Sequence, residues 1–166
     1  MNKLFNGILV LILFCSCSKD SIDPEKIVPD DVKKQLQAYD WIPTVANSDI
    51  INEPYHYKPA DCEKDNHYSF SFGSNSQKLK LERGKEICEA DTRTFELNFE
   101  GKAEQSFTYD REKKSIKFAS DDQYASYAVL VDGDYLVLIS QNSNPLADFI
   151  SMQYHFKGKS KTEKNK

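Results

Sequence analysis

The side chains that could perform catalysis are few in this chain and lie far apart. His56, His67 and His155 stand in unrelated segments, and no two are two or four residues apart, the spacings that put metal-binding imidazoles on one face. The sequence contains no Gly-x-Ser-x-Gly turn and no phosphate-cradling glycine loop. It therefore predicts no enzyme, no metal site and no cofactor, and each histidine is expected on a strand surface.

Potential oxygen ligands gather in "DCEKDN", where Asp61, Glu63, Asp65 and Asn66 follow one another closely. The stretch lacks the glycine and the spaced carboxylates of a calcium loop, whereas Asp-Asn before a strand is a common turn signal. We therefore favour a turn over a cation site. The stretch Asp132-Gly133-Asp134 is likewise predicted to be a hairpin turn.

Aromatic residues are unusually frequent, with ten Phe and nine Tyr. Tyr55, Tyr57, Tyr124 and Tyr127 are expected in loops or at strand ends, where rings can stack on a sugar or on a partner protein. These four form a tentative ligand-binding set. The alternative is an ordinary rim of single exposed rings, which needs no functional explanation.

The N-terminus has the pattern of an export signal. Lys3 gives a basic start, and residues 4–14 are an apolar run shorter than the roughly 20 residues of a permanent membrane span. Cys17 follows the small residue Ser16 and precedes a polar stretch, an arrangement that resembles the lipobox of bacterial lipoproteins. A plain secretory signal is the alternative interpretation.

The lipobox resemblance implies a lipid anchor. Residues 1–16 would be a cleaved signal peptide, Cys17 would carry the acyl chains, and residues 17–29 would be a polar tether. Two or more acyl chains hold a protein stably on a membrane. The expected location is the bacterial cell envelope, most simply the outer membrane, facing the periplasm or the cell surface.

The mature chain of 150 residues is enough for one domain with a sizeable core. The whole chain has a formal charge of −4, and Lys3 and the basic tail 157–166 together contribute five positive charges, so residues 17–156 carry −9. An acidic body argues against nucleic acid as a partner. The basic tail is expected to be disordered.

Cys62 and Cys88 are the two cysteines of this body. An even pair in an exported protein predicts a disulfide, because the compartment is oxidising. A free buried pair is the alternative.

Apolar spacing changes from a helical to a strand period after Trp41. In "PDDVKKQLQAYDW", Val32, Leu36 and Tyr39 are spaced i, i+4 and i+7, which predicts one short helix. Beyond it, apolar and polar residues alternate in short segments, as in strands with one solvated face. The alternating segments are Tyr68-Phe70-Phe72, Leu79-Leu81, Phe95-Leu97-Phe99, Phe107-Tyr109, Ile116-Phe118, "YAVLV", "YLVLI" and Ile150-Met152-Tyr154-Phe156.

Turn sequences separate these segments, at residues 73–76, 83–85, 100–102, 110–113 and 132–133. Short connections join antiparallel neighbours, so about eight strands form a meander that closes into a barrel or folds into a sandwich. The predicted class is mainly β, with one short N-terminal helix.

Several stretches together resemble the lipocalin-like lipoproteins of Gram-negative bacteria: "AYDW", "ADCEKDNHYSFSF", "KEICEA", "FELNF" and "YAVLVDGDYLVLIS". The resemblance implies an up-and-down barrel over residues 30–156, with Trp41 plugging one end and the two cysteines cross-linking neighbouring strands. Our leading functional hypothesis is a non-enzymatic, membrane-tethered barrel that binds a small apolar or amphipathic ligand or a cell-envelope partner.

The crowded inward face predicts that the barrel interior is mostly filled, because an eight-stranded barrel has room for its own side chains or for one small ligand. The expected inward residues are Tyr68, Phe70, Phe72, Phe95, Leu97, Phe99, Phe107, Tyr109, Phe118, Met152 and Tyr154. The second functional hypothesis is a loop-mediated interaction module, such as an inhibitor or an accessory subunit of a nutrient-uptake complex.

Overall fold

The computed structural model describes residues 28–46, 56–73, 76–89, 95, 99–119, 126–141 and 151–161. The elements are α1 (Asp30–Ala38), β1 (Tyr39–Thr44), the 3-10 turn η2 (Asp61–Glu63), β2 (His67–Phe72), β3 (Gln77–Glu82), β4 (Glu104–Asp110), β5 (Ser115–Phe118), β6 (Ser126–Asp132), β7 (Tyr135–Gln141) and β8 (Gln153–Ser160). The predicted class, mainly β with one short helix, is confirmed.

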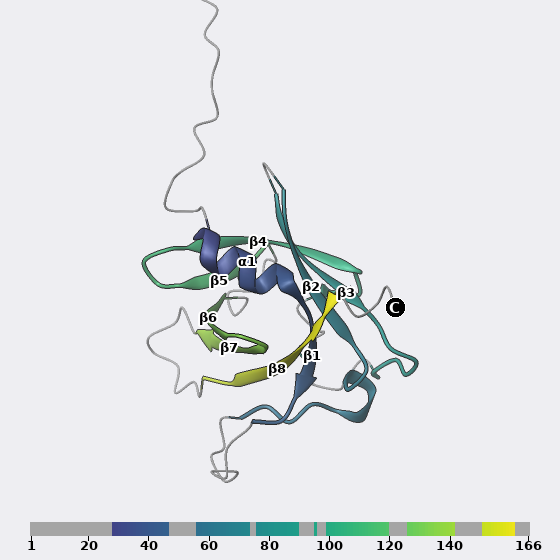
Figure 1. Ribbon diagram of the computed structural model, residues 1–166. Coiled ribbons are helices and arrows are strands. Elements are labelled where there is room, and N and C mark those ends of the chain that lie inside the picture. The colour runs from purple at the N-terminus through teal and green to yellow at the C-terminus, as the bar shows by residue number, and fades with distance from the viewer. Residues whose placement is uncertain are drawn as a thin grey trace, which may run out of the picture.

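The eight strands form one closed antiparallel barrel, in which each strand pairs with its sequence neighbours and β8 returns to β1. Figure 1 shows the strands surrounding one interior, with α1 lying across them. Pairing between β1 and β8 runs from Tyr39↔Ser160 to Thr44↔His155. The sandwich alternative is wrong, because a sandwich would leave edge strands where this ladder closes.

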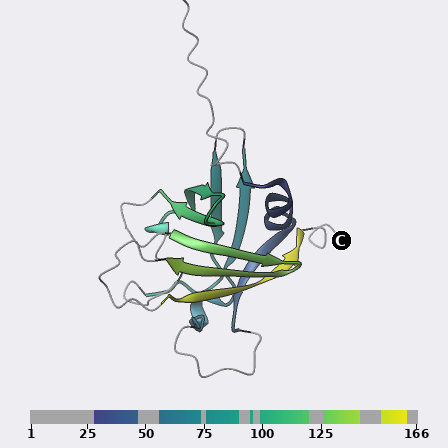
Figure 2. The ribbon, with the colours of Figure 1, turned by 90° about the vertical axis from the view of Figure 1, so that its left-hand side faces the viewer.

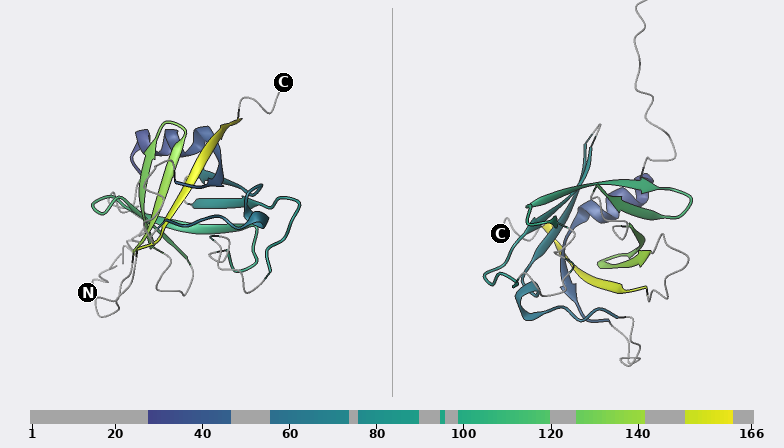
Figure 3. Two further views of the ribbon diagram at one scale, coloured as in Figure 1. Left: turned by 90° about the horizontal axis from the view of Figure 1, so that it is seen from below. Right: turned by 180° about the vertical axis from the view of Figure 1, so that it is seen from behind.

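The two ends of the barrel differ. The turn end carries the tight connections at residues 73–76, 111–114 and 133–134, whereas the loop end carries the long connections at 45–66, 83–103, 119–125 and 142–152. The predicted hairpin at Asp132-Gly133 is confirmed, with Asp132 paired to Tyr135 and Gly133 at a φ of 57°. Figure 3 shows this turn at the same end as α1.

Helix α1 covers the turn end. It contacts β1, β2 and β6, and β2 and β6 lie on opposite sides of an eight-stranded ring. Leu36 on its inner face is fully buried, and its carbonyl accepts a hydrogen bond from Trp41 Nε1 at 3.0 Å. The expectation that Trp41 plugs one end is confirmed. Figure 2 shows α1 on the same side as the last residues of β8.

The predicted inward face is largely the observed core. Burial alternates along β4, where Gln105, Phe107 and Tyr109 point inward and the residues between them are exposed. The buried apolar residues are Val28, Leu36, Trp41, Tyr68, Phe70, Leu79, Leu81, Phe95, Phe99, Phe107, Tyr109, Ile116, Phe118, Tyr127, Val129, Leu136, Leu138 and Phe156. Phe72 and Tyr154 pack against this cluster, Met152 is half-buried, and Leu97 lies outside the described residues.

The strand predicted over residues 95–99 is wrong for the residues described there. Phe95 and Phe99 belong to none of the eight strands and lie on the connection between β3 and β4. Both rings are nevertheless buried in the core. The period-two pattern therefore predicted the burial of Phe95 and Phe99 correctly but their secondary structure wrongly. A connection that folds back into a barrel can bury alternate residues without strand pairing. Correspondingly, the predicted turn at 100–102 leads into β4 from this connection and is not a hairpin between two strands.

Both predicted boundaries of the barrel domain need correction. The tail expected to be disordered from residue 157 instead continues β8 to Ser160, where Lys157 and Lys159 face outward and Gly158 packs on the Tyr39 ring. The inward positions here are small, so the alternation is not visible in hydrophobicity. At the other boundary Val28, assigned to the tether, is buried in the core.

Candidate functional site

Of the four tyrosines of the predicted binding set, the two that the structure describes differ in position and in exposure to solvent. Tyr55 and Tyr124 lie outside the described residues. Tyr57 is half-buried on the connection between β1 and β2. Tyr127 does lie near the start of β6, but its ring is 4% exposed and belongs to the core. The expectation of an available ring is therefore wrong for Tyr127, because the inward phase of β6 places it beside Phe118 and Phe95.

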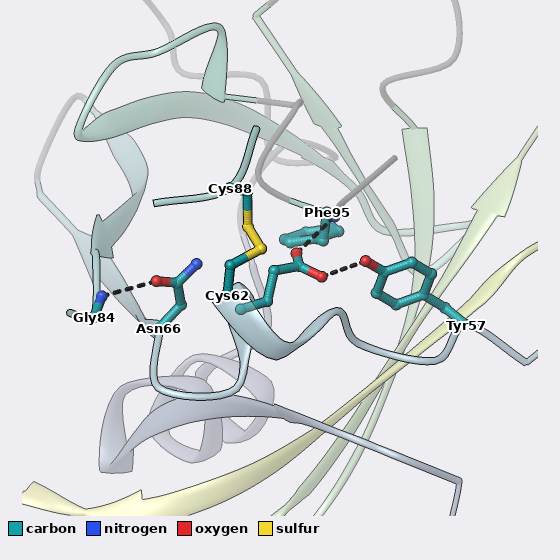
Figure 4. Close-up of a disulfide and its surroundings, with 7 residues drawn as sticks. Tyr57, Cys62, Asn66, Gly84, Cys88 and Phe95 are labelled. Atoms are coloured by element: carbon teal, nitrogen blue, oxygen red, sulfur yellow. Dashed lines mark hydrogen bonds between the residues drawn. A yellow bond between two sulfur atoms is a disulfide. The ribbon is translucent and has the colours of Figure 1, made fainter. Parts of the chain in front are cut away.

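The loop end contains a fully buried carboxylate. Glu63, at the end of η2, is 0% exposed. Its Oε1 accepts a hydrogen bond from the backbone N–H of Phe95 at 3.0 Å, and its Oε2 accepts one from the Tyr57 hydroxyl. Burial of a charged group is tolerated when its oxygens are hydrogen-bonded in this way. Figure 4 shows both bonds converging on this carboxylate.

The carboxylate also keeps the nearby phenols protonated. Burial, the hydrogen bond to Glu63 and the charge of Glu63 all raise the pKa of Tyr57 far above its ordinary value. Burial, followed by the charge of Glu63, raises the pKa of Tyr154 as well. Tyr57 therefore acts as a donor at neutral pH, and neither phenol is suited to act as a base or a nucleophile.

Two sets of contacts hold η2 and the Glu63 carboxylate in place. Cys62 and Cys88 form the predicted disulfide, with Cα atoms 5.2 Å apart, and so tie η2 to the chain that leaves β3 (Figure 4). The expectation that they cross-link neighbouring strands is wrong, because both cysteines lie on connections. Asp65 and Asn66 form the second, because their side chains accept hydrogen bonds from the backbone N–H groups of Lys85 and Gly84, both at 2.9 Å. The turn interpretation of "DCEKDN" is thus confirmed.

Phe95 is the centre of an aromatic cluster that fills the interior near the loop end. Its ring centroid lies 5.1 Å from that of Tyr154, 5.2 Å from Phe156 and 5.3 Å from Tyr68. Tyr154 in turn packs on Tyr57 at 4.8 Å. The rings thus run without interruption from the barrel interior to a half-buried tyrosine at the loop end.

Two of the three histidines meet, although they stand in unrelated segments of the sequence and no contact between them was predicted. His56 Nδ1 lies 2.8 Å from His155 Nε2, and the other ring nitrogen of His155 lies 2.7 Å from the Tyr135 hydroxyl. The sequence separation of 99 between the two histidines explains why their spacing gave no sign of this contact. Within the described part of the chain, no three His, Cys, Asp or Glu side chains converge as a metal site would require.

The fold and this loop-end arrangement define the class of the protein: a closed eight-stranded antiparallel barrel, consistent with a lipocalin-like barrel. In comparisons with known proteins, no family model, no curated protein and no solved structure matches the chain. In the described residues, no helix combines the length and apolar character needed to cross a membrane.

Proposed function

We propose that the chain is a lipid-anchored, lipocalin-like binding protein of the bacterial cell envelope, and that it recognises an envelope partner with the loop end of its barrel. The observation that carries the proposal is the filled interior. Phe95 and Phe99 enter from a connection and are buried to within 1% among the strand residues. An eight-stranded barrel holds either its own side chains or one small ligand, and here its own rings take that space.

The position of the tether supports the same assignment. Helix α1 follows the tether directly and covers the turn end. A lipid on Cys17 would therefore attach the barrel through its turn end. The loop end would then be remote from the anchor and available to a partner.

A contrast between two exposed apolar residues tests the loop-end assignment. Ile87, beside Cys88 at the loop end, is 78% exposed, and Leu130, on the outer wall of β6, is 55% exposed. A photo-reactive amino acid at position 87 should give a discrete cross-linked adduct in native membranes, and the same residue at position 130 should not. Equal adducts at both positions, or none at either, would contradict the proposal.

A second candidate, carriage of a small amphipathic ligand inside the barrel, is favoured by Gln105. This residue points inward and is 4% exposed, and its Nε2 has no hydrogen-bond partner in the described part of the chain. A buried donor of this kind could meet a polar group of a ligand. Native mass spectrometry of protein taken gently from membranes should show a bound small molecule if this candidate holds, and Gln105→Leu should reduce its occupancy.

The anchor has its own test, since Cys17 lies outside the described residues. Mass spectrometry of the mature protein should find acyl mass on an N-terminal Cys17, and Cys17→Ala should release the barrel from the membrane fraction. An unmodified cysteine on a released product would refute the anchor but would leave the loop-end assignment standing.

A further inference from the structure

A chain of three hydrogen-bonding side chains lies on the outer face of the wall formed by β7 and β8. His155 is flanked in β8 by Tyr154 and Phe156, whose rings join the core, so its own ring points outward. It is nevertheless only 6% exposed. The His56 ring covers it at a centroid distance of 5.0 Å, and Tyr135 approaches its other side at 5.8 Å.

The histidine contact sits at one end of a segment that crosses the loop end. His56 forms a parallel bridge with Gln153, and the backbone N–H of Tyr57 donates to the Gln153 carbonyl at 2.8 Å. Tyr57 then donates its hydroxyl to Glu63. We name residues 56–63 the strap. The described contacts between the start of the strap and β8 include this backbone ladder, the two imidazoles and the packing of the Tyr57 ring on Tyr154.

The hydrogen bond between the two imidazoles limits how many protons the pair can hold. One ring nitrogen must donate and the other must accept, which is possible when both rings are neutral or when one is protonated. When both are protonated, every ring nitrogen carries a hydrogen. His56 Nδ1 and His155 Nε2 would then direct two donors and two positive charges at each other across 2.8 Å.

The surroundings of His155 place this second protonation at acidic pH. Burial is the larger cause that lowers the pKa of His155, and the charge of His56 lowers it further. Directly opposite His155 stand Thr44 of β1 and Val137 of β7, which carry no charge. On the same outer face Lys157 is paired with Asp134 at 2.6 Å, and the Tyr135 hydroxyl lies 2.7 Å from His155 Nδ1.

We propose that His56 and His155 form a pH-operated latch that holds the strap against β8 at neutral pH and releases it in acid. The proposal rests on the proposed function, because what the latch would regulate is binding at the loop end. The direction follows from linkage: the released strap frees His155 to return toward the ordinary histidine pKa of about 6.5, so it binds more protons than the latched state. The latched state is therefore most stable above a pH of about 6.5, the ordinary histidine pKa, and loses stability as the pH falls below that value.

Amide hydrogen exchange of Tyr57 measures the latch directly, because this N–H is bonded to β8 within the strap. After correction for intrinsic exchange, the protection factor of the Tyr57 amide should fall between pH 7.5 and pH 4.5. The fall should be about tenfold for each unit by which the pKa of His155 rises when the strap is released. Amides of the β6–β7 hairpin should keep their protection over the same range. Unchanged protection at Tyr57, or equal loss in the hairpin, would overturn the proposal.

Two variants separate the latch from other acid effects. His155→Gln keeps hydrogen-bonding groups but cannot be protonated, so it should abolish the pH dependence at Tyr57. His67→Gln, on β2, which β1 separates from β8, should retain it. If His155→Gln fails to fold, NMR titration of the His56 and His155 rings in the wild-type protein decides. A coupled titration, in which the second proton binds at a lower pH than the first, supports the latch. Two independent titrations overturn it.

Cross-linking from position 87 at pH 7.5 and pH 5 then separates the latch from the proposed function. An adduct whose yield changes with pH in wild type, but not in His155→Gln, supports regulation of the loop end. An adduct of constant yield, together with pH-dependent exchange at Tyr57, overturns the regulatory role alone. Absence of an adduct at both pH values counts against the proposed function and leaves the exchange result intact.

Discussion

Phe95 shows how one side chain outside the strands can determine whether a barrel is filled. Its ring meets those of Tyr68, Phe118, Tyr127, Tyr154 and Phe156. Phe95→Ala should reduce the free energy of unfolding by about 3–5 kcal/mol, because the surrounding rings belong to several strands and cannot all collapse into the space. Chemical denaturation monitored by circular dichroism measures this loss.

The matched control for Phe95→Ala is Ile87→Ala, which truncates an exposed side chain on the same connection. It should change the free energy of unfolding by no more than about 0.5 kcal/mol. A loss below about 1 kcal/mol for Phe95→Ala would mean that the ring does not pack as described, and an accompanying gain in binding of a hydrophobic dye would point to an opened interior.

Tyr57 should contribute to stability through its hydroxyl group, which donates a hydrogen bond to Glu63. Tyr57→Phe removes the donor to the buried Glu63 oxygen and keeps the ring on Tyr154, so it isolates the hydroxyl. Losing this hydrogen bond to a charged acceptor should cost about 1.5–3 kcal/mol. Thermal or urea unfolding measures the cost. Ser71→Ala is the control, since its long 3.4 Å bond on an exposed strand face should matter little, and equal effects of the two variants would refute the role given to Glu63.

At the scale of elements, closure of the barrel depends on a close approach between β1 and β8. A Cβ at Gly158 would lie 2.7 Å from Cγ of Tyr39, whose ring packs on Trp41 at 5.3 Å. Gly158→Ala should therefore displace Tyr39 and destabilise the protein by about 1–3 kcal/mol. Near-ultraviolet circular dichroism should also report a changed environment of Trp41.

Gly73→Ala is the natural comparison for Gly158→Ala. A Cβ at Gly73 would meet Ser76 Oγ at 3.2 Å, a side-chain atom that can rotate away. Its effect should be the smaller of the two. If Gly73→Ala is as costly as Gly158→Ala, the contact with Tyr39 is not what limits closure.

The disulfide joins two connections that the barrel ladder leaves unpaired. It spans 26 residues, and the chain-entropy relation for a loop of that length gives a contribution of about 3.5 kcal/mol to the free energy of unfolding. The double variant Cys62→Ser, Cys88→Ser should lose about this amount in urea titration. Wild-type protein in excess reductant should match the double variant, and a disagreement between the two would show that the serines perturb the fold for another reason.

At the scale of the whole molecule, the parts that the sequence predicted are those set by local alternation and turn chemistry. Phe70 and Leu79, a paired couple in β2 and β3, and Asp132-Gly133 between β6 and β7 each carry their signal within a few residues. The short helix before Trp41 is of the same kind. These local signals gave the order of β2 to β8, because an up-and-down barrel pairs each strand with the next, whereas β1 was not among the alternating segments.

The parts that the sequence missed depend on where long connections return. Alternation over 95–99 could not distinguish a strand from a connection that buries two rings. Glu63 gave no sign of burial, because its donors come from six and 32 residues away. The contact of His56 with His155 likewise joins distant segments, whereas the cysteine pair is a long-range contact of the loop end that composition did signal.

The direct pairing of Tyr39 with Ser160 has a consequence for the order of the chain itself. Because the two ends of the barrel's backbone are neighbours, a polar linker of about eight residues, reaching roughly 25 Å, could join residue 161 to residue 28. The polypeptide could then be opened between β7 and β8 with all eight ladders retained. Such a circular permutant would begin at the loop end of the barrel, and a lipid attached there would turn the loop end toward the membrane and the turn end away from it.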